Sequence, residues 1–387
     1  MKILHLSPYV PDVRADHAGG VCMGKTVETL QKYHEVTVLT CCNDAHEEKM
    51  LRERPEFRYI RTSKAGFLAK VLLHLNMPNM FAIRRSRAFR KMICEIIEKE
   101  KIEAVHAEFT AMGQYAWIKR KYPGIRFNLA EHDVALQSFE RMAADAGGLR
   151  KIYYSIEKRK VERAEGRYVR AADTVFTFNE KDKALLQQKY GIPAGKIRAL
   201  NPYYGIELDG EPKESGKDRC FCFVGLMNRL ENHEAAMRLV RIVREIPAAE
   251  AEGWKLTIIG AHPRPELQAA ESERIHITGF VDDINKEIGK AQFAVFPLIH
   301  GAGIKLKVLL AFGLGLPVVT GQVGAEGIDP DGEVIRLAET DEDFKREILR
   351  LMRDDAGRKE LSRLSRAYVR DHFNWQKTEQ IYNEIYN

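Results

Sequence analysis

Short apolar runs alternate with helical patterns from one end of the chain to the other, and this alternation limits the folds available to it. Helical patterns separate the apolar runs, for example at residues 24–33, 86–99 and 152–171. Strands joined by helices form parallel sheets that are covered on both faces. The runs that we predict as strands form two series, at 2–6, 35–40, 104–107, 126–130 and 174–177, and at 220–224, 255–259, 275–278, 294–297 and 317–320. We therefore predict an α/β protein with two Rossmann-like domains.

The length of the chain agrees with two domains, because 387 residues exceed what one hydrophobic core usually organises. The segment DGEPKESGKD at 209–218 is polar and lacks apolar periodicity, so we place the domain boundary there. This gives an N-terminal domain at 1–208, a C-terminal domain at 209–367 and a final helical segment at 368–387. The final segment is rich in aromatic residues and either packs on its own domain or crosses back to the first.

The composition excludes several classes of protein. The formal net charge of +6 is modest for a dedicated nucleic-acid binder, and the six cysteines lack the spacing of zinc ligands. Cysteines in apolar, strand-like contexts are usually buried thiols, which fits a reducing cytoplasm. No run approaches the roughly 18 apolar residues that cross a bilayer, and the opening MKILHLSPYVP lacks signal-peptide features. We therefore expect a cytoplasmic protein.

The segment GAGIKLKVLLAFGLGLPVVTGQVGAEG at 301–327 has the features of a diphosphate-binding floor. Gly301 and Gly303 allow the backbone to approach a ligand closely. Lys305 and Lys307 follow at the predicted start of a helix, where free N–H groups and the helix dipole favour an anion. Lys305 is the stronger candidate, because Lys307 is two residues further along the helix. The other interpretation is that both lysines are solvated surface charges.

Two further glycines, Gly19 and Gly20, follow the first predicted strand and precede a helix expected to begin near residues 21–24. Ligands bind at the carboxyl ends of strands in open α/β sheets, so this turn is a second candidate for a ligand contact. The motif is not GxGxxG, and no acidic residue completes a dinucleotide fingerprint after the second strand. A nicotinamide dehydrogenase is therefore disfavoured. An ordinary flexible loop is the other interpretation of these glycines.

Taken together, these segments resemble glycosyltransferase family 4 (glycosyl transferases group 1), whose members have the GT-B fold. The resemblance covers nearly the whole chain, and it rests on the order and spacing of the segments more than on any one of them. They are Gly19-Gly20 with HEVTVLT (34–40), AEHD (130–133), AADTVFTFNEKDK (171–183), FVGLMNRLENHEAAM (223–237), ITGFVDD (277–283), GAGIKLKVLLAFGLGLPVV (301–319) and GAEGI (324–328).

The resemblance implies two Rossmann-like domains whose sheets face each other across a cleft, with the C-terminal helix crossing back to the first domain. It also implies transfer of a sugar from a nucleotide-diphosphate donor to a glycan or lipid-linked acceptor. The reaction would proceed with retention and without a metal or other cofactor, in polysaccharide or glycoconjugate biosynthesis. The donor would lie mostly on the C-terminal domain and the acceptor mostly on the N-terminal one.

Roles for individual residues follow from the same resemblance. His132 would bond near the transferred sugar, and Lys305 with the helix start would stabilise the charge that develops on the departing diphosphate. Gly19 and Gly20 would touch the donor, and the backbone around Phe280 and Val281 would hold the base. The predicted site is catalytic His132 and Lys305, with Gly19, Gly20, Arg229, Phe280, Val281, Gly301, Gly303, Lys307, Gly324 and Glu326 as donor-binding residues.

Two of these residues have a plain structural alternative. His132 lies just after a predicted strand, where a histidine is often a structural hydrogen-bonding group, and its neighbours Glu131 and Asp133 could orient its ring. Glu326 could bond a sugar hydroxyl or could cap a helix near exposed backbone amides.

The chain departs from the family pattern at several positions. Leu310 takes the place of a glutamate that usually binds the donor's ribose, and Ala302 takes the place of its partner. A leucine cannot bond a hydroxyl, so another residue holds the ribose or the donor is unusual. Leu226 and Glu231 replace an arginine and a lysine that often follow the FVG strand, and Arg229 is the candidate substitute. Two alternatives stay open: a sugar-nucleotide epimerase of the same fold, and a non-catalytic subunit that supports an active transferase.

Basic stretches at 84–91 and 150–170 lie in the N-terminal half, and the apolar segment 67–81 adjoins the first of them. Such runs are commonly solvated helix faces. The alternative is contact with anionic lipid headgroups at the inner face of a membrane, which would suit a lipid-linked acceptor.

Overall fold

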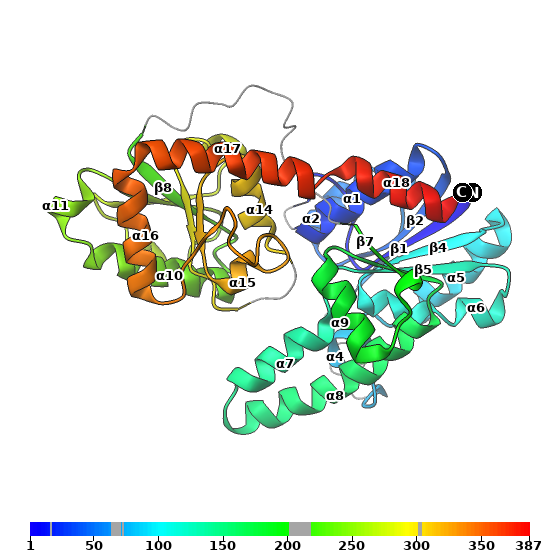
Figure 1. Ribbon diagram of the computed structural model, residues 1–387. Coiled ribbons are helices and arrows are strands. Elements are labelled where there is room, and N and C mark those ends of the chain that lie inside the picture. Colours follow the sequence, from blue (N-terminus) through cyan, green and yellow to red (C-terminus); the bar gives the residue numbers. More distant parts are fainter. Residues whose placement is uncertain (16–17, 63–70, 72, 201–217, 301–303) are drawn as a thin grey trace. The chain divides into compact units, whose positions relative to one another are not determined.

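The computed structural model describes residues 1–15, 18–62, 71, 73–200, 218–300 and 304–387 (Figure 1). The chain divides into two compact units. One comprises Met1–Tyr204 with Trp375–Asn387, and the other comprises Gly205–Asn374. Apart from Asp218, the boundary segment predicted at 209–218 lies outside the described residues.

The first unit is built on a sheet of seven parallel strands in the order β3-β2-β1-β4-β5-β6-β7. The strand order reverses between β1 and β4, which is the point where ligands bind in such sheets. The strands are β1 (Lys2–Ser7), β2 (Glu35–Cys42), β3 (Arg58–Arg61), β4 (Ala104–Glu108), β5 (Arg126–Glu131), β6 (Thr174–Thr177) and β7 (Ile197–Ala199).

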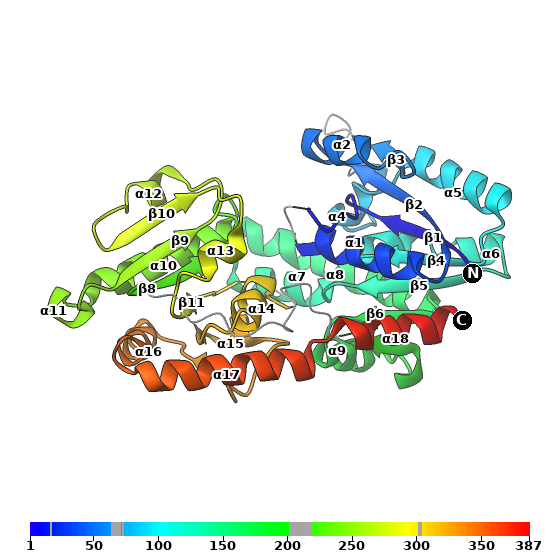
Figure 2. The same ribbon diagram turned by 90° about the horizontal axis from the view of Figure 1, so that it is seen from above.

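Helices cover both faces of this sheet (Figures 1 and 2). Helices α7 and α8 lie side by side as a hairpin that extends away from the strands (Figure 1). The helices are α1 (Ala18–Gln31), α2 (Ala45–Arg52), α4 (Asn79–Ala82), α5 (Arg87–Glu100), η2 (Thr110–Tyr115), α6 (Ile118–Lys121), α7 (Ala135–Asp145), α8 (Gly148–Ala171), α9 (Glu180–Tyr190), η3 (Ala194–Lys196) and α18 (Trp375–Tyr386).

The C-terminal helix α18 is an integral part of the first unit, as the resemblance implied. Along α1, the indole Nε1 of Trp375 donates to Thr29 Oγ1 over 2.7 Å, and Glu379 pairs with Lys32 Nζ at 2.9 Å. Next to the sheet, Thr378 Oγ1 donates to the Leu200 carbonyl over 2.7 Å. Tyr386 is fully buried. Helix α18 therefore completes the core of this unit on one face of the sheet.

The second unit repeats the plan with six parallel strands in the order β10-β9-β8-β11-β12-β13. The reversal falls between β8 and β11. The strands are β8 (Cys220–Val224), β9 (Lys255–Ile259), β10 (Ile275–Gly279), β11 (Ala294–Phe296), β12 (Val318–Thr320) and β13 (Arg336–Leu337). The helices are α10 (Leu230–Glu245), α11 (Ala248–Ala251), α12 (Pro265–Gln268), α13 (Ile284–Ile288), α14 (Leu306–Gly313), α15 (Gln322–Ala325), α16 (Asp341–Arg353) and α17 (Asp355–His372).

The predicted fold class, an α/β protein with two Rossmann-like parallel sheets, is confirmed. Each strand predicted from the sequence is present, with ends that shift by no more than two residues. Strands β3, β7 and β13 were not predicted. Strand β3 reads RYIR and alternates between partly buried and exposed residues at the sheet edge, so it has no apolar run to detect.

The final helical segment differs from the prediction. Residues 368–386 are not one helix, because α17 ends at His372 and α18 begins at Trp375. Tyr368 belongs to α17, and its hydroxyl donates to the Ile328 carbonyl over 3.0 Å while its ring packs near Phe312. Residues from Trp375 onward belong to the first compact unit, and residues up to Asn374 belong to the second.

A buried carboxylate fixes the hairpin of α7 and α8. Glu165 Oε1 accepts from the backbone N–H of Ala135 over 2.7 Å, so a residue of α8 caps the start of α7. Glu165 Oε2 accepts from the Tyr190 hydroxyl over 2.6 Å, which ties in α9. Burial raises the pKa of Glu165 to about 7, although these hydrogen bonds oppose the shift. The folded protein thus holds this proton more tightly than the unfolded chain does.

We expect the free energy of unfolding of the wild type to fall as pH rises from about 5 to about 7.5. In Glu165→Gln this fall should be smaller. A carboxyl group whose pKa is raised in the folded state contributes stability below the unfolded pKa, and this contribution is lost as pH rises to the folded pKa. Glutamine does not titrate and removes that contribution. Thermal unfolding measured across this range should give a shallower slope for the variant. Glu162→Gln, at an exposed position of the same helix, is the control and should keep the wild-type slope.

Candidate functional site

Lys305 lies at the start of α14, where the sequence predicted a phosphate site. It is the N-cap residue, and its carbonyl accepts from the N–H groups of Val308 and Leu309. Its side chain is buried, and Nζ lies 3.7 Å from Oε2 of Glu326. The interpretation of Lys305 as a solvated surface charge is therefore wrong. A lysine at this end of a helix also faces backbone N–H groups that lack intrahelical acceptors.

Lys307 also packs into this region, which its position in the sequence did not suggest. Its Nζ donates to Asn232 Oδ1 and lies 5.5 Å from the centroid of the Phe223 ring. Burial lowers the pKa of Lys307 to about 8; Glu231 opposes the shift, while Lys305 and Arg229 add to it. The second unit thus gathers three cationic side chains beside two carboxylates.

Three predicted residues besides the lysines, Arg229, Glu326 and Gly324, also lie on the second unit. Arg229 is the N-cap of α10 and its side chain is exposed. Glu326 follows α15 and is buried against Lys305. Gly324 has a packing role, because a Cβ there would lie 1.9 Å from Oγ1 of Thr320, which donates to the Phe296 carbonyl.

The remaining donor-binding predictions on this unit are separate from the lysines. Phe280 follows β10 and is 75% exposed, and Val281 is partly buried beside it. Strand β10 is at the edge of the sheet, with β9 between it and β8. Gly301 and Gly303 lie outside the described residues.

His132 lies just beyond β5 in the first unit and is held on three sides. Its Nε2 lies 2.7 Å from Oε2 of Glu108. Its ring stacks on Phe109, with centroids 3.8 Å apart and planes 5° apart, and Phe178 meets it edge-on at 4.5 Å. The ring can therefore neither tilt nor slide freely.

The residue that orients His132 is not the one expected from the sequence. Glu131 was a candidate, but its Oε2 accepts from the Thr110 hydroxyl. Burial raises the pKa of Glu131 well above its ordinary value, and repulsion by Glu165 adds to the rise. Successive residues of a strand point to opposite faces, so Glu131 and a group that follows it by one residue diverge. The oxygen that His132 meets comes from Glu108 on the neighbouring strand β4.

Gly19 and Gly20 also lie at a different place in the fold from the turn predicted for them. Helix α1 begins at Ala18, so Gly19 and Gly20 lie in its first turn and not in the loop before it. In this region it is Gly24 that lets the helix pack closely against another backbone segment, because a Cβ there would lie 2.5 Å from the backbone of Asp12 and of Val13. Asp12 anchors this loop through a paired contact with the guanidinium of Arg14.

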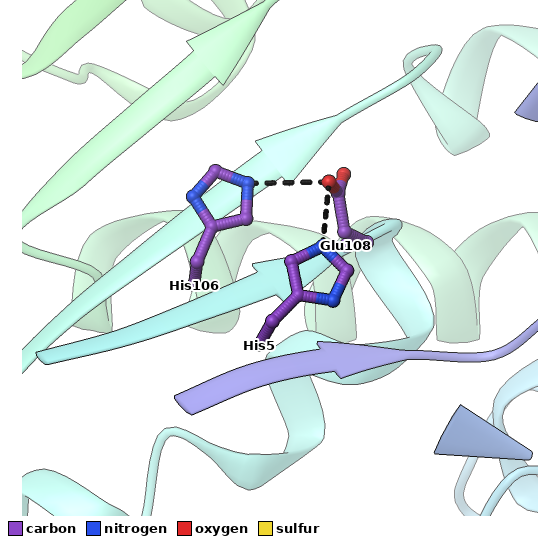
Figure 3. A group of neighbouring side chains, drawn as sticks. All are labelled: His5, His106 and Glu108. Carbon is purple, nitrogen blue, oxygen red and sulfur yellow. Dashed lines mark hydrogen bonds and ion pairs between the residues drawn. The ribbon is translucent and has the colours of Figure 1, made fainter. Parts of the chain in front are cut away.

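Sequence reasoning missed a buried polar group at the reversal point of the first sheet. His5 of β1 and His106 and Glu108 of β4 are fully buried and meet side by side (Figure 3). Oε1 of Glu108 lies 3.2 Å from Nε2 of each histidine. The signal was present in KILHLS and AVHAE, since polar residues in the middle of a central parallel strand must have partners.

These three side chains are the one group among the described residues whose ligand-type atoms lie close enough to hold a metal ion, all within 4.8 Å of one another.

Two family models match the chain, and together they span most of its length. The description "Glycosyl transferase 4-like domain" matches residues 18–202, and "Glycosyl transferases group 1" matches residues 218–354. No curated protein sequence matches the chain.

Solved structures share the whole fold at low sequence identity. Sucrose-phosphate synthase from Thermosynechococcus elongatus is 18% identical, with a TM-score of 0.73 and coverage of 100% of this chain and 98% of that one. HepE from Anabaena, solved with UDP, is 13% identical, with a TM-score of 0.68 and coverage of 100% and 99%. A glycosyltransferase from Rickettsia africae is 16% identical, with a TM-score of 0.62 and coverage of 100% and 97%. The two family matches, on the two sheets described above, show that this chain belongs to the glycosyl transferases group 1 and is a glycosyltransferase with the GT-B fold.

Proposed function

We propose that this glycosyltransferase moves a sugar from a nucleotide-diphosphate donor to a glycan or lipid-linked acceptor, with retention and without a metal, in polysaccharide or glycoconjugate biosynthesis. The donor class is supported by a group of cations: Lys305 and Lys307 at the start of α14, with Arg229 at the start of α10. Cleavage of a glycosyl–phosphate bond places negative charge on the departing diphosphate, and fixed cations with helix N–H groups stabilise that charge. The UDP bound to HepE agrees with a donor of this class.

The remaining predicted residues take their roles within this proposal. His132 bonds a hydroxyl of the transferred sugar. The backbone at Phe280 and Val281 holds the base, and Glu326 positions Lys305 or bonds a second hydroxyl. Gly19, Gly20, Gly301, Gly303 and Gly324 provide close backbone approach to the donor. The ribose hydroxyls are held elsewhere than at Leu310, which is partly buried on α14.

We also propose that the first unit contacts anionic lipid through α8. This helix exposes Leu149, at 85%, and Ile152, and exposed Arg150 and Lys151 lie beside them. The basic stretch at 84–91 contributes less, because Arg84 and Arg90 pack over the aromatic rings of Tyr9 and Trp117. An apolar face flanked by cations is the usual design of an interfacial helix. None of the described helices is both long enough and apolar enough to span a bilayer.

We expect Lys305→Ala to weaken binding of nucleoside diphosphates by about 10–100-fold, the effect of losing one hydrogen bond to a charged group. Calorimetry with UDP, GDP and ADP would measure the affinity. A panel of nucleotide sugars, tested with product analysis, would then identify the donor and the reaction.

Lys359→Ala is the matched control, because Lys359 is an exposed lysine of α17 that pairs with Asp355, and it should bind as the wild type does. Failure of the wild-type protein to bind any nucleoside diphosphate would overturn the proposal. Conversion of the donor sugar without an acceptor would favour the epimerase, and binding without turnover would favour the non-catalytic subunit.

We expect Lys307→Met to raise the melting temperature at pH 7 by a few degrees while it lowers nucleoside diphosphate affinity. Burial disfavours the charge of Lys307, and methionine keeps the packing on Phe223 without that charge. Such opposed changes are typical of residues kept for binding at a cost in stability. Differential scanning calorimetry and titration would measure both quantities. A fall in melting temperature together with unchanged affinity would assign Lys307 a structural role.

We expect Leu149→Ser/Ile152→Ser to abolish binding to vesicles that contain phosphatidylglycerol. The substitutions remove the apolar contact and leave the cations of α8 in place. Co-sedimentation would measure the bound fraction at low and physiological salt. Ile284→Ser, at an exposed apolar position on the second unit, should bind as the wild type does. Vesicle binding that survives the double substitution would refute this surface.

A further inference from the structure

The buried group at the reversal of the first sheet lies directly beneath His132, and strand register explains why. His5 on β1 is the Cα partner of His106 on β4, and Glu108 is the partner of Ala130 on β5. Residues two apart on a strand share a face, so His106 and Glu108 lie on the same face, and His132, two residues beyond Ala130, follows on that side. One carboxylate therefore meets three imidazole rings from three adjacent segments.

Glu108 is held in its ionised form. Its burial alone would raise the pKa, but electrostatic attraction to His106 and hydrogen bonds from His132 and His5 outweigh burial and hold the pKa of Glu108 well below its ordinary range. An ionised carboxylate only accepts hydrogen bonds. Each ring nitrogen that faces it must then carry a proton. For His132 that nitrogen is Nε2, at 2.7 Å from Glu108 Oε2.

The other contacts of the group agree with this proton arrangement. Nδ1 of His106 lies 2.6 Å from the Tyr386 hydroxyl, which can donate to it when the proton of His106 is on Nε2. The contact from His106 Nε2 to Glu108 has the distance of a hydrogen bond but lacks its alignment, so its effect is mainly electrostatic. Burial lowers the pKa of His5, whose Nε2 lies 3.2 Å from Glu108 Oε1.

The backbone beside His132 is strained in a way that fixes the plane of its ring. Phe109 has a φ of +66°, a conformation rare for a residue with a side chain, and its N–H donates to the Ala130 carbonyl over 2.8 Å. This places the Phe109 ring flat against His132. With the plane of the His132 ring fixed, its orientation within that plane depends on which of its two nitrogens contacts Glu108.

A metal ion shared by His5, His106 and Glu108 explains the contacts less well. A histidine that binds a metal through Nε2 carries its proton on Nδ1 and almost always donates it to a partner. Nδ1 of His5 is buried and has no hydrogen-bond partner. A buried acceptor without a partner is tolerated more often than a buried donor, so the geometry favours a His5 ring that donates from Nε2 to the carboxylate and leaves Nδ1 unprotonated.

We propose that Glu108 is the positioning residue of His132: it fixes the tautomer with the proton on Nε2, so that Nδ1 presents a lone pair to a substrate hydroxyl. His5 and His106 hold Glu108 in place, and Tyr386 of α18 holds His106. The tautomer is a property of the free protein. Only the role of Nδ1 as acceptor for a sugar hydroxyl rests on the proposed function.

The test is NMR of the full chain labelled with ¹⁵N-histidine. His132→Gln identifies the His132 signals by their loss. In the wild type we expect a protonated Nε2 and an unprotonated Nδ1. In Glu108→Gln the amide can donate to Nε2, so we expect a shift of the tautomer population toward protonated Nδ1. Glu131→Gln is the matched control, because Glu131 is an equally buried glutamate next to His132 that contacts Thr110 instead, and it should leave the tautomer unchanged.

Measurement of enzyme activity provides a second, independent test of the role of Glu108. Once a donor is known, Glu108→Gln should lower kcat by about 10–100-fold, equivalent to one hydrogen bond to a charged group, with little change in the affinity for nucleoside diphosphate. A wild-type His132 protonated mainly on Nδ1 would overturn the proposal even if Glu108→Gln did not fold. Stoichiometric zinc bound to the purified protein, lost in His5→Gln, would also overturn it. Failure to bind any nucleoside diphosphate would refute the proposed function alone, because the tautomer is measured without substrate.

Discussion

The parallel arrangement of both sheets, with an order that reverses at the centre, is the constraint on which the rest of the structure depends. The order reverses between the neighbouring strands β1 and β4 in one unit and between β8 and β11 in the other, and at each of these points the helices that follow the strands diverge to opposite faces. Loops at the carboxyl ends of the central strands therefore have room for a ligand. Both groups of buried charge described above, around Glu108 and around Lys305, lie at or just beyond these ends.

The two units reach this arrangement by different physical means. In the first, polar side chains stand within the central strands, and the cost of burying Glu108 is offset by imidazole donors. Helix α18 contributes here, since Tyr382 packs edge-on against His106 and Tyr386 bonds to it. In the second, the central strands β8 and β11 read CFCFV and AVF and are almost wholly buried and apolar. Their charged groups come from the loops and helix starts that follow.

This difference explains how much of the protein could be predicted from its sequence. Buried parallel strands are continuous apolar runs, so the strands of the two sheets were predicted in their correct places, apart from β3, β7 and β13. The edge strand β3 was missed because its residues are polar. The partner of His132 was missed because pairing of β4 with β5 depends on register across a helical crossover, which local sequence does not encode. Glu131 adjoins His132 in sequence, but Glu108 adjoins it in space.

The charges of the second unit also explain how a site without the usual ribose-binding glutamate could hold a nucleotide. Lys307 is partly desolvated beside Lys305 and Arg229, so an arriving diphosphate relieves repulsion between cations as well as adding attraction. Binding energy drawn from the phosphates is common to every nucleoside diphosphate, whereas Leu310 offers the ribose no hydrogen bond. In the proposed site, discrimination between bases then comes from the contacts of the base itself.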